Sequence, residues 1–484
     1  CIFRLINWYY NRYIKHFMIN LKLKPDLVQS LDRLNFYSFS LLSNENLNND
    51  EKLSLFSKAN TFITSLLNNS KINFTENKSA LHFVPRFYSD HDMSSKYPNI
   101  FSDLDTMFKT ANYINSSKYS NITDIIHLGS GGSNLGPKLI YNSFSHLSNG
   151  PNVHFISNLD PLSLNKKILK LNPTNTLIIC VSKSFSTYET QENLKKIRAW
   201  FLKSRSEELF YNNLFFITSF PEKAIKYGLS SSNIIKLDTS IGGRFSIWSS
   251  SNLVNAIIFG KEFFTNFLSG GKSIDDLVVN NLEKSLPYIL ALKSFYFRKY
   301  HSIYNHIVIP YSDQLSLLPS YLQQLVMESN GKSVNSFNEN ISNSPCSFIF
   351  GEVGTDAQHS FFQALHQSTL SFTGDLICFS NNLNSEFCIF DDYDKNNSKD
   401  LQNFAISQYL AFKNGSDKTI ESVHKQVKGN KPVDLFIFNK LNEYTLGQLL
   451  CIYEYKTLFE ASFSDINPFD QYGVELGKQI FKNL

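Results

Sequence analysis

Short apolar runs alternate with amphipathic segments from Asn121 onward, and this alternation predicts a parallel β-sheet. The runs are apolar at nearly every position, which is typical of strands covered by helices on both faces of a sheet. They are Ile122–Leu128, Val153–Ser157, Thr176–Ser182, Leu214–Thr218 and Ile234–Leu237. Strands and helices in this order indicate an α/β domain, which we place at residues 116–260.

A second block of the same kind is predicted over residues 261–484. Its strand candidates are His306–Pro310, Ser347–Phe350 and Leu376–Ser380. Its helical candidates are Gln314–Met327, Asp356–Gln367, the long apolar segment Thr445–Phe463 and a final helix after Asn467-Pro468. The fold class is therefore predicted to be α/β, with two doubly wound parallel-sheet sandwich domains and a C-terminal helical segment.

The first part of the chain has a different pattern. Residues 18–115 carry apolar positions at helical spacing, so we expect a mainly helical N-terminal region that packs on the second domain. Residues 1–25 contain no Asp or Glu but several Lys and Arg, as transit peptides do, although no serine precedes Ser30. We favour a start at Met18, which makes residues 1–17 a leader or a non-native extension.

The composition is that of a globular protein, with 42% apolar residues and a formal net charge of +4 spread along the chain. It indicates neither a nucleic-acid partner nor a membrane surface, and no apolar run reaches the ~18 residues needed to cross a bilayer. Six cysteines are scattered without a C-x-x-C spacing. This favours reduced, buried thiols in a cytoplasmic protein over disulfides or a metal site.

The first strand candidate ends at a glycine-rich loop that begins a helix. The loop is Gly129-Ser130-Gly131-Gly132-Ser133, and a helix-like segment begins near Pro137. Glycines let the backbone approach a ligand closely, and the free N–H groups at a helix start face a negative charge. We therefore expect this loop, with Gly132 and Ser133, to hold an anion.

A second loop, Ser182–Thr187, is rich in hydroxyl groups and carries the ammonium of Lys183. These side chains match the several acceptor oxygens of a phosphate, although the loop alone could be an ordinary Ser/Thr-rich helix cap. Neither loop has the spacing of a nucleoside triphosphate loop or of the complete dinucleotide-binding fingerprint. A small phosphorylated metabolite therefore fits the two loops better than ATP or NAD.

Two further segments offer groups for catalysis. Arg244 follows Gly242-Gly243 after a strand candidate, where its guanidinium can face a developing oxyanion; otherwise it is a surface arginine beside a turn. Glu328 ends a helix-like segment among mostly apolar and amide residues, where a carboxylate can act as a base. Gln324 precedes it by one turn on the same face. Alone, a glutamate near a helix end is more often solvated.

His359 and His366 lie seven residues apart, and we interpret His359 as an acid–base candidate. A metal pair would call for i,i+4 spacing or a nearby third ligand, and the sequence offers neither. We therefore expect no metal and no cofactor. Lys478, on the last predicted helix, would ordinarily be a solvated lysine.

Together and in this order, these motifs resemble the glucose-6-phosphate isomerase (phosphoglucose isomerase) family. The resemblance runs from near Asn20 to the end of the chain. It rests on Gly129–Pro137, Ser182–Thr187 with Glu189-Thr190, Gly242–Ser246, Met327–Lys332, Gly354–Gln367 and Phe469–Lys478, with further support from Asn73–Glu76, Leu81-His82 and Gly429–Pro432. It implies SIS-type domains and the reversible isomerisation of glucose 6-phosphate to fructose 6-phosphate, in glycolysis and gluconeogenesis.

The resemblance also implies a role for each motif residue. The sugar phosphate would bind to Ser133, Ser182, Lys183, Ser184 and Thr187. Glu328 resembles the base that moves a proton between C2 and C1, and Arg244 with the Gly243 backbone resembles the group that stabilises a cis-enediol(ate). His359 and Lys478 resemble residues that open the sugar ring. Gln324 and Gln471 resemble substrate contacts.

The family is homodimeric, so the resemblance further implies active sites shared between subunits through His359. Two alternatives stay open. A sugar-phosphate-binding regulator would keep the two phosphate loops but could dispense with Glu328, His359 and Lys478, all of which are present. A related aldose–ketose isomerase could also accept mannose 6-phosphate.

Overall fold

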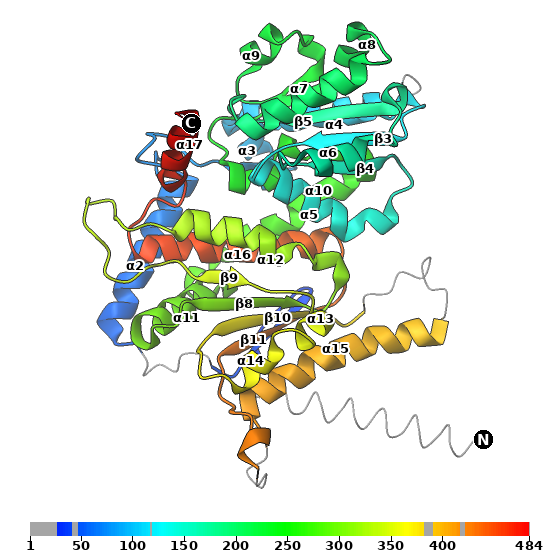
Figure 1. Ribbon diagram of the computed structural model, residues 1–484. Helices are drawn as coiled ribbons and strands as arrows, with labels where there is room; N and C mark the ends of the chain where they lie inside the picture. Colours follow the sequence, from blue (N-terminus) through cyan, green and yellow to red (C-terminus); the bar gives the residue numbers. More distant parts are fainter. Residues whose placement is uncertain (1–26, 41–46, 117–118, 382–390, 417–421, 484) are drawn as a thin grey trace, which may run out of the picture. The chain divides into compact units, whose positions relative to one another are not determined.

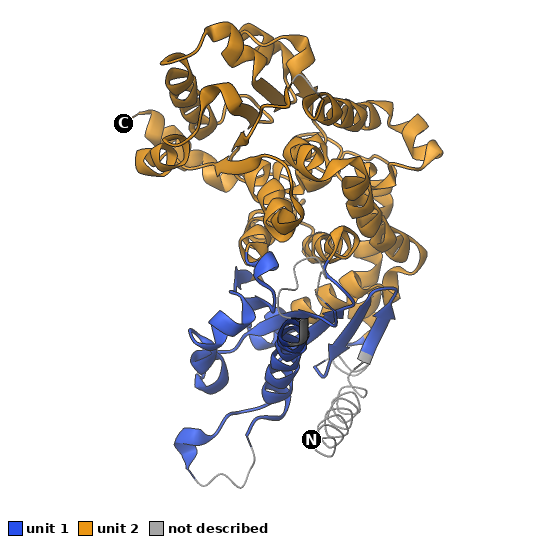
Figure 2. Cartoon of the chain, turned by 90° about the vertical axis from the view of Figure 1, so that its right-hand side faces the viewer, with its two compact units in different colours: residues 1–48, 296–316, 348–441 blue, residues 49–295, 317–347, 442–484 orange. Residues whose placement is uncertain are grey.

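The computed structural model describes residues 27–40, 47–116, 119–381, 391–416 and 422–483. The expected extension at residues 1–17 lies outside this range. The chain forms two compact units, each built from three separate stretches of sequence (Figure 2). Unit 1 comprises Cys1–Asn48, Tyr296–Ser316 and Phe348–Leu441, and unit 2 comprises Asn49–Phe295, Leu317–Ser347 and Asn442–Leu484.

The sheet of unit 2 has five parallel strands in the order β4-β3-β5-β6-β7 (Figure 1). They are β3 (Asp124–Leu128), β4 (Asn152–Ile156), β5 (Thr176–Val181), β6 (Leu214–Thr218) and β7 (Ile234–Lys236). The strand order reverses direction between β3 and β5. In an open α/β sheet, ligands bind beyond the carboxyl ends of the strands at such a reversal, so the loops after β3 and β5 occupy the expected position for a site.

Helices cover both faces of this sheet. Side chains at alternate strand positions form one apolar core with α6 (Pro161–Ile168), α7 (Tyr188–Leu202), α8 (Glu207–Asn212) and α9 (Pro221–Lys226). The intervening strand positions are buried as well; α4 (Pro98–Ile114) contacts β7, and α5 (Gly132–Phe144) contacts β4. Burial on both faces explains why these strands are apolar throughout.

The rest of unit 2 is helical. Its remaining α-helices are α2 (Asn49–Leu67), α3 (His91–Lys96), α10 (Leu253–Asn280), α12 (Leu318–Leu322), α16 (Glu443–Phe463) and α17 (Glu475–Lys482), with α11 (Leu286–His301) running into unit 1. α10 and α16 lie unusually close: a Cβ added to Gly270 would stand 1.9 Å from the carbonyl oxygen of Tyr444. Glycine is needed there because any side chain would push the helices apart.

A buried ionic cluster ties three of these elements together. Arg86, in the short helix η2 (Val84–Phe87), donates to both carboxylate oxygens of Asp275 on α10, at 2.7 and 2.6 Å, and also to Glu454 on α16. The indole of Trp248 donates to the second Glu454 oxygen at 2.8 Å. Burial by itself raises the pKa of Glu454, but Arg86 and His82 lower it to about 2. Burial raises the pKa of Asp275, which Arg86 and Tyr455 oppose. Arg86 thus faces both buried carboxylates, as a buried cation requires.

The sheet of unit 1 has six strands in the order β1-β2-β11-β10-β8-β9. They are β1 (Leu27–Leu31), β2 (Leu34–Ser38), β8 (Asn305–Pro310), β9 (Phe348–Phe350), β10 (Thr373–Phe379) and β11 (Val433–Phe438). The last four named are mutually parallel, while β2 pairs antiparallel with both β1 and β11. One face packs against α13 (Gly354–Gln358), α14 (Phe362–Gln367) and α15 (Asp391–Asn414).

The α/β fold class with two largely parallel sheets is confirmed, and all eight strand candidates are strands whose bounds differ from the predicted ones by three residues at most. The expected helical region differs at its start, because residues 27–38 form the β1–β2 hairpin. Alternate burial of Leu34, Phe36 and Ser38 gives β2 a period of two. The predicted boundary at residue 260 falls within α10, and the compact units interleave along the chain rather than following one another.

Two helical predictions also change in detail. Asp356–Gln367 divides into α13 and α14, with His359 at the end of the first, so His359 and His366 do not share one continuous helix. α5 begins at Gly132, ahead of Pro137. Among the described residues, no helix is both long and apolar enough to cross a membrane.

Candidate active site

The glycine loop after β3 touches the loop that carries Arg244. Gly131 adopts a φ of 55°, and Gly132 opens α5. A Cβ on Gly132 would stand 2.0 Å from the carbonyl oxygen of Gly243, so the two backbones meet only because Gly132 has no side chain. The first turn of α5 therefore begins beside Gly243. The Ser133 N–H in this turn donates to the carbonyl oxygen of Ser130 at 3.2 Å, which keeps the glycine loop tightly folded.

A buried histidine makes a hydrogen bond to the backbone of this turn. The Nε2 of His127, on β3, lies 2.9 Å from the carbonyl oxygen of Ser133 and must donate to it. Burial lowers the pKa of His127 to about 4, an effect that this hydrogen bond partly opposes. The imidazole is therefore neutral at physiological pH, with its proton on Nε2, and holds the Ser133 backbone.

The loop after β5 presents an ammonium and a hydroxyl that lack an anionic partner. The Lys183 Nζ donates to the carbonyl oxygens of Thr239 and Ile241 at 2.9 and 2.7 Å, and within the described part of the chain no carboxylate forms an ion pair with it. Burial, and then repulsion from Lys78, lowers its pKa to about 8. The Ser182 hydroxyl is buried without a hydrogen-bond partner. Both groups fit a phosphate.

The remaining residues of this loop are held from within it and from α7. Ser186 donates to the hydroxyl of Ser184 at 2.7 Å. Phe185 has a φ of 52°, and its ring lies 4.6 Å from that of Phe216, which anchors the loop to the sheet. Thr187 precedes α7 without capping its N–H groups. A hydrogen bond of 3.2 Å between Ser130 and Thr190 joins the first turn of α7, which follows this loop, to the glycine loop.

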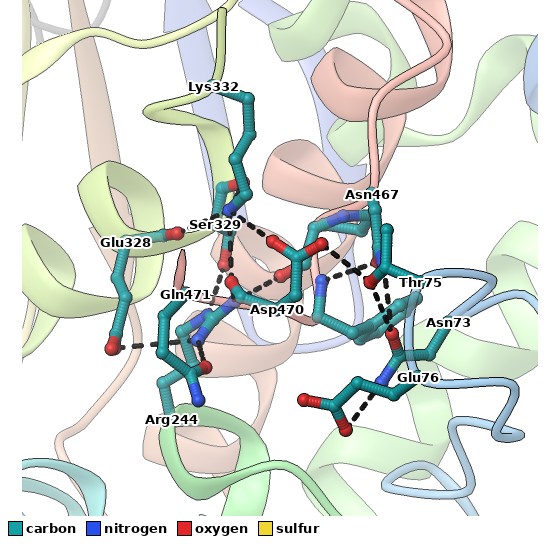
Figure 3. A network of polar contacts seen from close by, with 12 residues as sticks. Asn73, Thr75, Glu76, Arg244, Glu328, Ser329, Lys332, Asn467, Asp470 and Gln471 are labelled. Carbon is teal, nitrogen blue, oxygen red and sulfur yellow. Dashed lines mark hydrogen bonds and ion pairs between the residues drawn. The ribbon is translucent and has the colours of Figure 1, made fainter. Parts of the chain in front are cut away.

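Arg244 lies at the centre of a polar network in unit 2 (Figure 3). Its Nε donates to the Ser329 hydroxyl at 2.7 Å, and one terminal nitrogen donates to Gln471 Oε1 at 3.0 Å. The other terminal nitrogen donates to the carbonyl oxygens of Pro468 and of Asp470. With every nitrogen of its guanidinium engaged, Arg244 has a fixed orientation.

Glu328 lies at the end of a turn of π-helix, η11 (Gln323–Glu328), a feature that frequently occurs at functional sites. Its Oε2 accepts a hydrogen bond from Gln324 at 2.9 Å and lies 3.5 Å from Arg244. Its side chain is 25% exposed, which leaves the carboxylate accessible. A Cβ on Gly131 would stand 2.9 Å from Gln324 Nε2, so Gln324 connects the glycine loop to Glu328.

Unit 2 thus brings together most of the predicted site residues. The group contains Gly132, Ser133, Ser182, Lys183, Ser184, Thr187, Gly243, Arg244, Gln324, Glu328 and Gln471. Lys478 is not joined to it: its ammonium pairs with Glu475 at 2.7 Å on α17, and its side chain is 61% exposed. His359 is exposed and belongs to unit 1.

Sequence reasoning missed several members of the network around Arg244. Ser329 accepts from Arg244, and Lys332 and Asp470 contact the segments on either side of it. Asn73, Thr75 and Asn467 extend the network further (Figure 3). All of them except Asn467, which lies two residues before Phe469–Lys478, fall inside the quoted motifs. Membership of a motif was the only sequence signal that marked them.

The arrangement can hold a phosphorylated substrate and move a proton on it. Two adjacent loops offer backbone N–H groups, hydroxyls and a lysine to the phosphate. A carboxylate with a fixed guanidinium beside it can remove a proton next to a carbonyl while the guanidinium stabilises the resulting oxyanion. Among the described residues, no group of three His, Cys, Asp or Glu side chains could hold a metal ion; the expectation of no cofactor remains a prediction.

Comparisons with known proteins agree with this chemistry. The phosphoglucose isomerase family model matches residues 36–484. The chain is 33% identical to the glucose-6-phosphate isomerase of Acinetobacter baylyi over 447 residues, which cover 88% of this chain and 80% of that protein. It is 34% identical to that of Christiangramia forsetii, over 87% and 81% of the two chains.

A solved structure is similar as well. The crystal structure of a glucose-6-phosphate isomerase from Chlamydia trachomatis matches with a TM-score of 0.83 and 27% identity. The match covers 96% of this chain and 90% of that one. The similarity therefore extends over both units.

Proposed function

The chain belongs to the phosphoglucose isomerase family, and on that premise we propose that Glu328 and Arg244 carry out the proton transfer of its reaction. The chain catalyses the reversible isomerisation of glucose 6-phosphate to fructose 6-phosphate, a step of glycolysis and gluconeogenesis. The residue roles that follow are part of the proposal.

The phosphate of the sugar binds between the two loops at the carboxyl edge of the unit 2 sheet. Lys183 supplies the charge, and Ser133, Ser182, Ser184 and Thr187 supply hydroxyls or backbone donors. Binding at this end leaves C1 and C2 of the open-chain sugar to reach Glu328. This placement is supported by the Lys183 ammonium, which among the described residues contacts carbonyl oxygens rather than a carboxylate, and by the buried Ser182 hydroxyl, which has no hydrogen-bond partner.

Glu328 removes the proton from C2 of the open-chain aldose and returns it to C1. The electrons of the C2–H bond form a C1=C2 double bond while the C1 carbonyl oxygen takes up the negative charge, which gives a cis-enediol(ate); Arg244 with the Gly243 N–H stabilises its oxygens. When the proton returns to C1, the hydroxyl proton on O2 moves to O1, and C2 becomes the carbonyl carbon of fructose 6-phosphate. Gln324 and Gln471 contact the substrate and hold the two catalytic side chains in place. The observation that carries this proposal is the Glu328 carboxylate held between Gln324 and Arg244 at 2.9 and 3.5 Å, beside the glycine loop.

Ring opening is assigned to His359 and Lys478, by their match to the family's motif. From the same match to the family's motif, we infer that the enzyme is a homodimer in which His359 serves the site of the neighbouring subunit. We also infer a cytoplasmic location, in keeping with the free, buried thiols of Cys180, Cys346, Cys378 and Cys451.

The test is a coupled assay of fructose 6-phosphate conversion with Glu328→Gln, which is nearly isosteric but cannot accept the proton. We expect kcat to fall by about 10³ while KM changes little, because the phosphate loops are intact. Glu222→Gln, an exposed glutamate on α9, serves as the control and should match the wild type.

Wild-type turnover by Glu328→Gln would remove Glu328 from the role of base. The same assay with a chelator tests the metal-free mechanism: turnover should be unchanged, and its loss would contradict the assignment of all chemistry to side chains.

A further inference from the structure

Lys332 caps the end of the π-helical turn that carries Glu328. Its Nζ donates to the carbonyl oxygens of Glu328 and Ser329, at 2.8 and 2.9 Å, and to that of Asp470 at 3.0 Å. The last carbonyl groups of a helix have no partner within it, and a lysine is well suited to them. Lys332 thus holds the backbone on which the carboxylate of Glu328 is mounted.

Asp470 connects the same turn to two other segments. Its carboxylate accepts from Thr75 at 2.7 Å through one oxygen and lies 3.4 Å from the Lys332 Nζ through the other. Its carbonyl oxygen accepts from Arg244 at 2.9 Å as well as from Lys332. Lys332 and Arg244 therefore share one main-chain acceptor, which sets the distance between their segments (Figure 3).

The two cations and two carboxylates in this contact stabilise one another's charged forms. Burial, and then the neighbouring Arg244, lowers the pKa of Lys332, whereas Asp470 and Glu328 favour its charged form. Two cations, Lys332 and Arg244, are thus held side by side only because two carboxylates face them. Removing one member leaves a buried charge without its partner, which displaces the others.

We propose that Lys332 and Asp470 are positioning residues that together hold Glu328 and Arg244 at the separation the proton transfer requires. The proposal rests on the roles assigned to Glu328 and Arg244 above. Neither Lys332 nor Asp470 needs to touch the substrate. Their effect is on alignment, and a misplacement of about 1 Å in a catalytic group can reduce the rate by 10²-fold.

The test compares Lys332→Met with Lys332→Arg. The methionine keeps the length of the side chain but donates no hydrogen bond, so we expect kcat to fall about 10²-fold. KM for fructose 6-phosphate should stay within about threefold, because the phosphate loops do not contact Lys332. The arginine can still donate to the same carbonyls, so Lys332→Arg should recover at least about tenfold in kcat.

Lys58 provides a matched control. It donates to the carbonyl oxygen of Phe463 at 3.1 Å and pairs with Asp465, so it caps the end of α16 as Lys332 caps its turn. It makes no contact with Glu328 or Arg244 among the described residues. Lys58→Met should lower thermal stability but leave kcat unchanged, which separates a structural lysine from a positioning one.

Three outcomes would overturn the proposal. In the first, Lys332→Met retains the kcat of the wild type. In the second, its KM rises by as large a factor as its kcat falls. In the third, Lys332→Arg has a kcat no higher than that of Lys332→Met. If Lys332→Met fails to fold, Asp470→Asn is tested in its place. This change keeps the shape of the side chain but removes the negative charge that faces Lys332. An unchanged kcat in Asp470→Asn contradicts the proposal. If Glu328→Gln keeps full turnover, both the base assignment and this proposal are wrong. If Glu328→Gln is inactive while Lys332→Met is fully active, only this proposal is wrong.

Discussion

Lys183 shows how burial prepares a single residue for its ligand. Its ammonium contacts two carbonyl oxygens and, within the described ranges, no carboxylate. Burial and the nearby Lys78 lower its pKa to about 8, with Glu76 and Asp238 opposing the shift. A phosphate dianion supplies the missing charge. The free enzyme and the substrate complex should therefore hold this proton differently.

We predict that kcat/KM falls as the pH rises above about 8, while kcat stays nearly flat. Above its pKa the free lysine loses the charge that attracts the phosphate, whereas bound phosphate keeps the lysine protonated. The measurement is the pH profile of both parameters, with Lys183→Arg as the comparison, because arginine remains charged throughout. A kcat/KM that is constant up to pH 9.5 would contradict this role.

His127 has a lower pKa than a surface histidine, because it is buried, and its titration should therefore affect stability. The unfolded chain protonates it near its ordinary pKa of 6.5, whereas the folded pKa is about 4. The neutral form favours folding fully above pH 6.5, and this contribution is lost as the pH falls toward 4. At its limit the effect is about 3 kcal/mol.

The measurement is urea denaturation across pH 4 to 8 for the wild type and His127→Gln. The glutamine amide can donate to the Ser133 carbonyl as Nε2 does but does not titrate. The variant should therefore lose less stability than the wild type between pH 6.5 and 4. Equal losses would show that His127 does not govern the acid sensitivity.

The sequence was informative about residues whose side chains face a ligand. Residue type and position together predict a binding function for serines and a lysine at the carboxyl end of a buried strand. The same holds for an arginine after two glycines. Lys332 and Asp470 act largely on main-chain carbonyls, which every segment possesses, so no side-chain pattern marks them in advance. Their function depends on distances between segments far apart in the chain.

At the scale of elements, the apolar strands were predicted well because burial on both faces removes any ambiguity of period. The elements that were not predicted are those whose local sequence pattern does not match their burial or their backbone hydrogen bonding. β11 carries the buried Asp434 within its apolar run, and the β1–β2 hairpin is short enough to be taken for part of a helical region. The π-helical turn at Gln323–Glu328 differs from an α-helix by hydrogen bonding alone.

We predict that Gly270→Ala destabilises the protein by about 1–3 kcal/mol, because its Cβ would collide with the backbone of Tyr444 and overpack the α10–α16 contact. Gly477→Ala, on α17, is the matched control, since nothing lies within 4 Å of its Cβ. That change should be neutral or stabilising by up to about 1 kcal/mol. Thermal and urea unfolding measure both; a Gly270→Ala variant as stable as wild type would mean that the helices can separate without cost.

At the scale of the whole molecule, the proposed chemistry draws on both units, since Glu328 belongs to unit 2 and His359 to unit 1. The sharing of sites between subunits can be tested by complementation. Glu328→Gln and His359→Ala should each be nearly inactive alone. In a mixed dimer, one site receives both substitutions and the other receives neither, so activity should return on mixing after dissociation and reassembly.

The activity recovered should approach one working site in each mixed dimer. No recovery, despite heterodimers detected by mass, would place both residues in the site of one subunit. A protein that remains monomeric in sedimentation at assay concentration would rule out the shared site altogether.

The position of α16 has a consequence for how the protein is made. Every residue from Thr445 to Phe463 is buried, so this helix forms the centre of unit 2. On the ribosome it emerges after the whole of unit 1's last stretch, Phe348–Leu441. At a translation rate of 5–20 residues per second, the synthesis of this stretch takes roughly 5 to 20 s. Only then can α16 pack against the helices of unit 2 that were made earlier. During that time α10 exposes to the cell the apolar face that α16 will cover, and a nascent chain of this protein is therefore a natural client for chaperones.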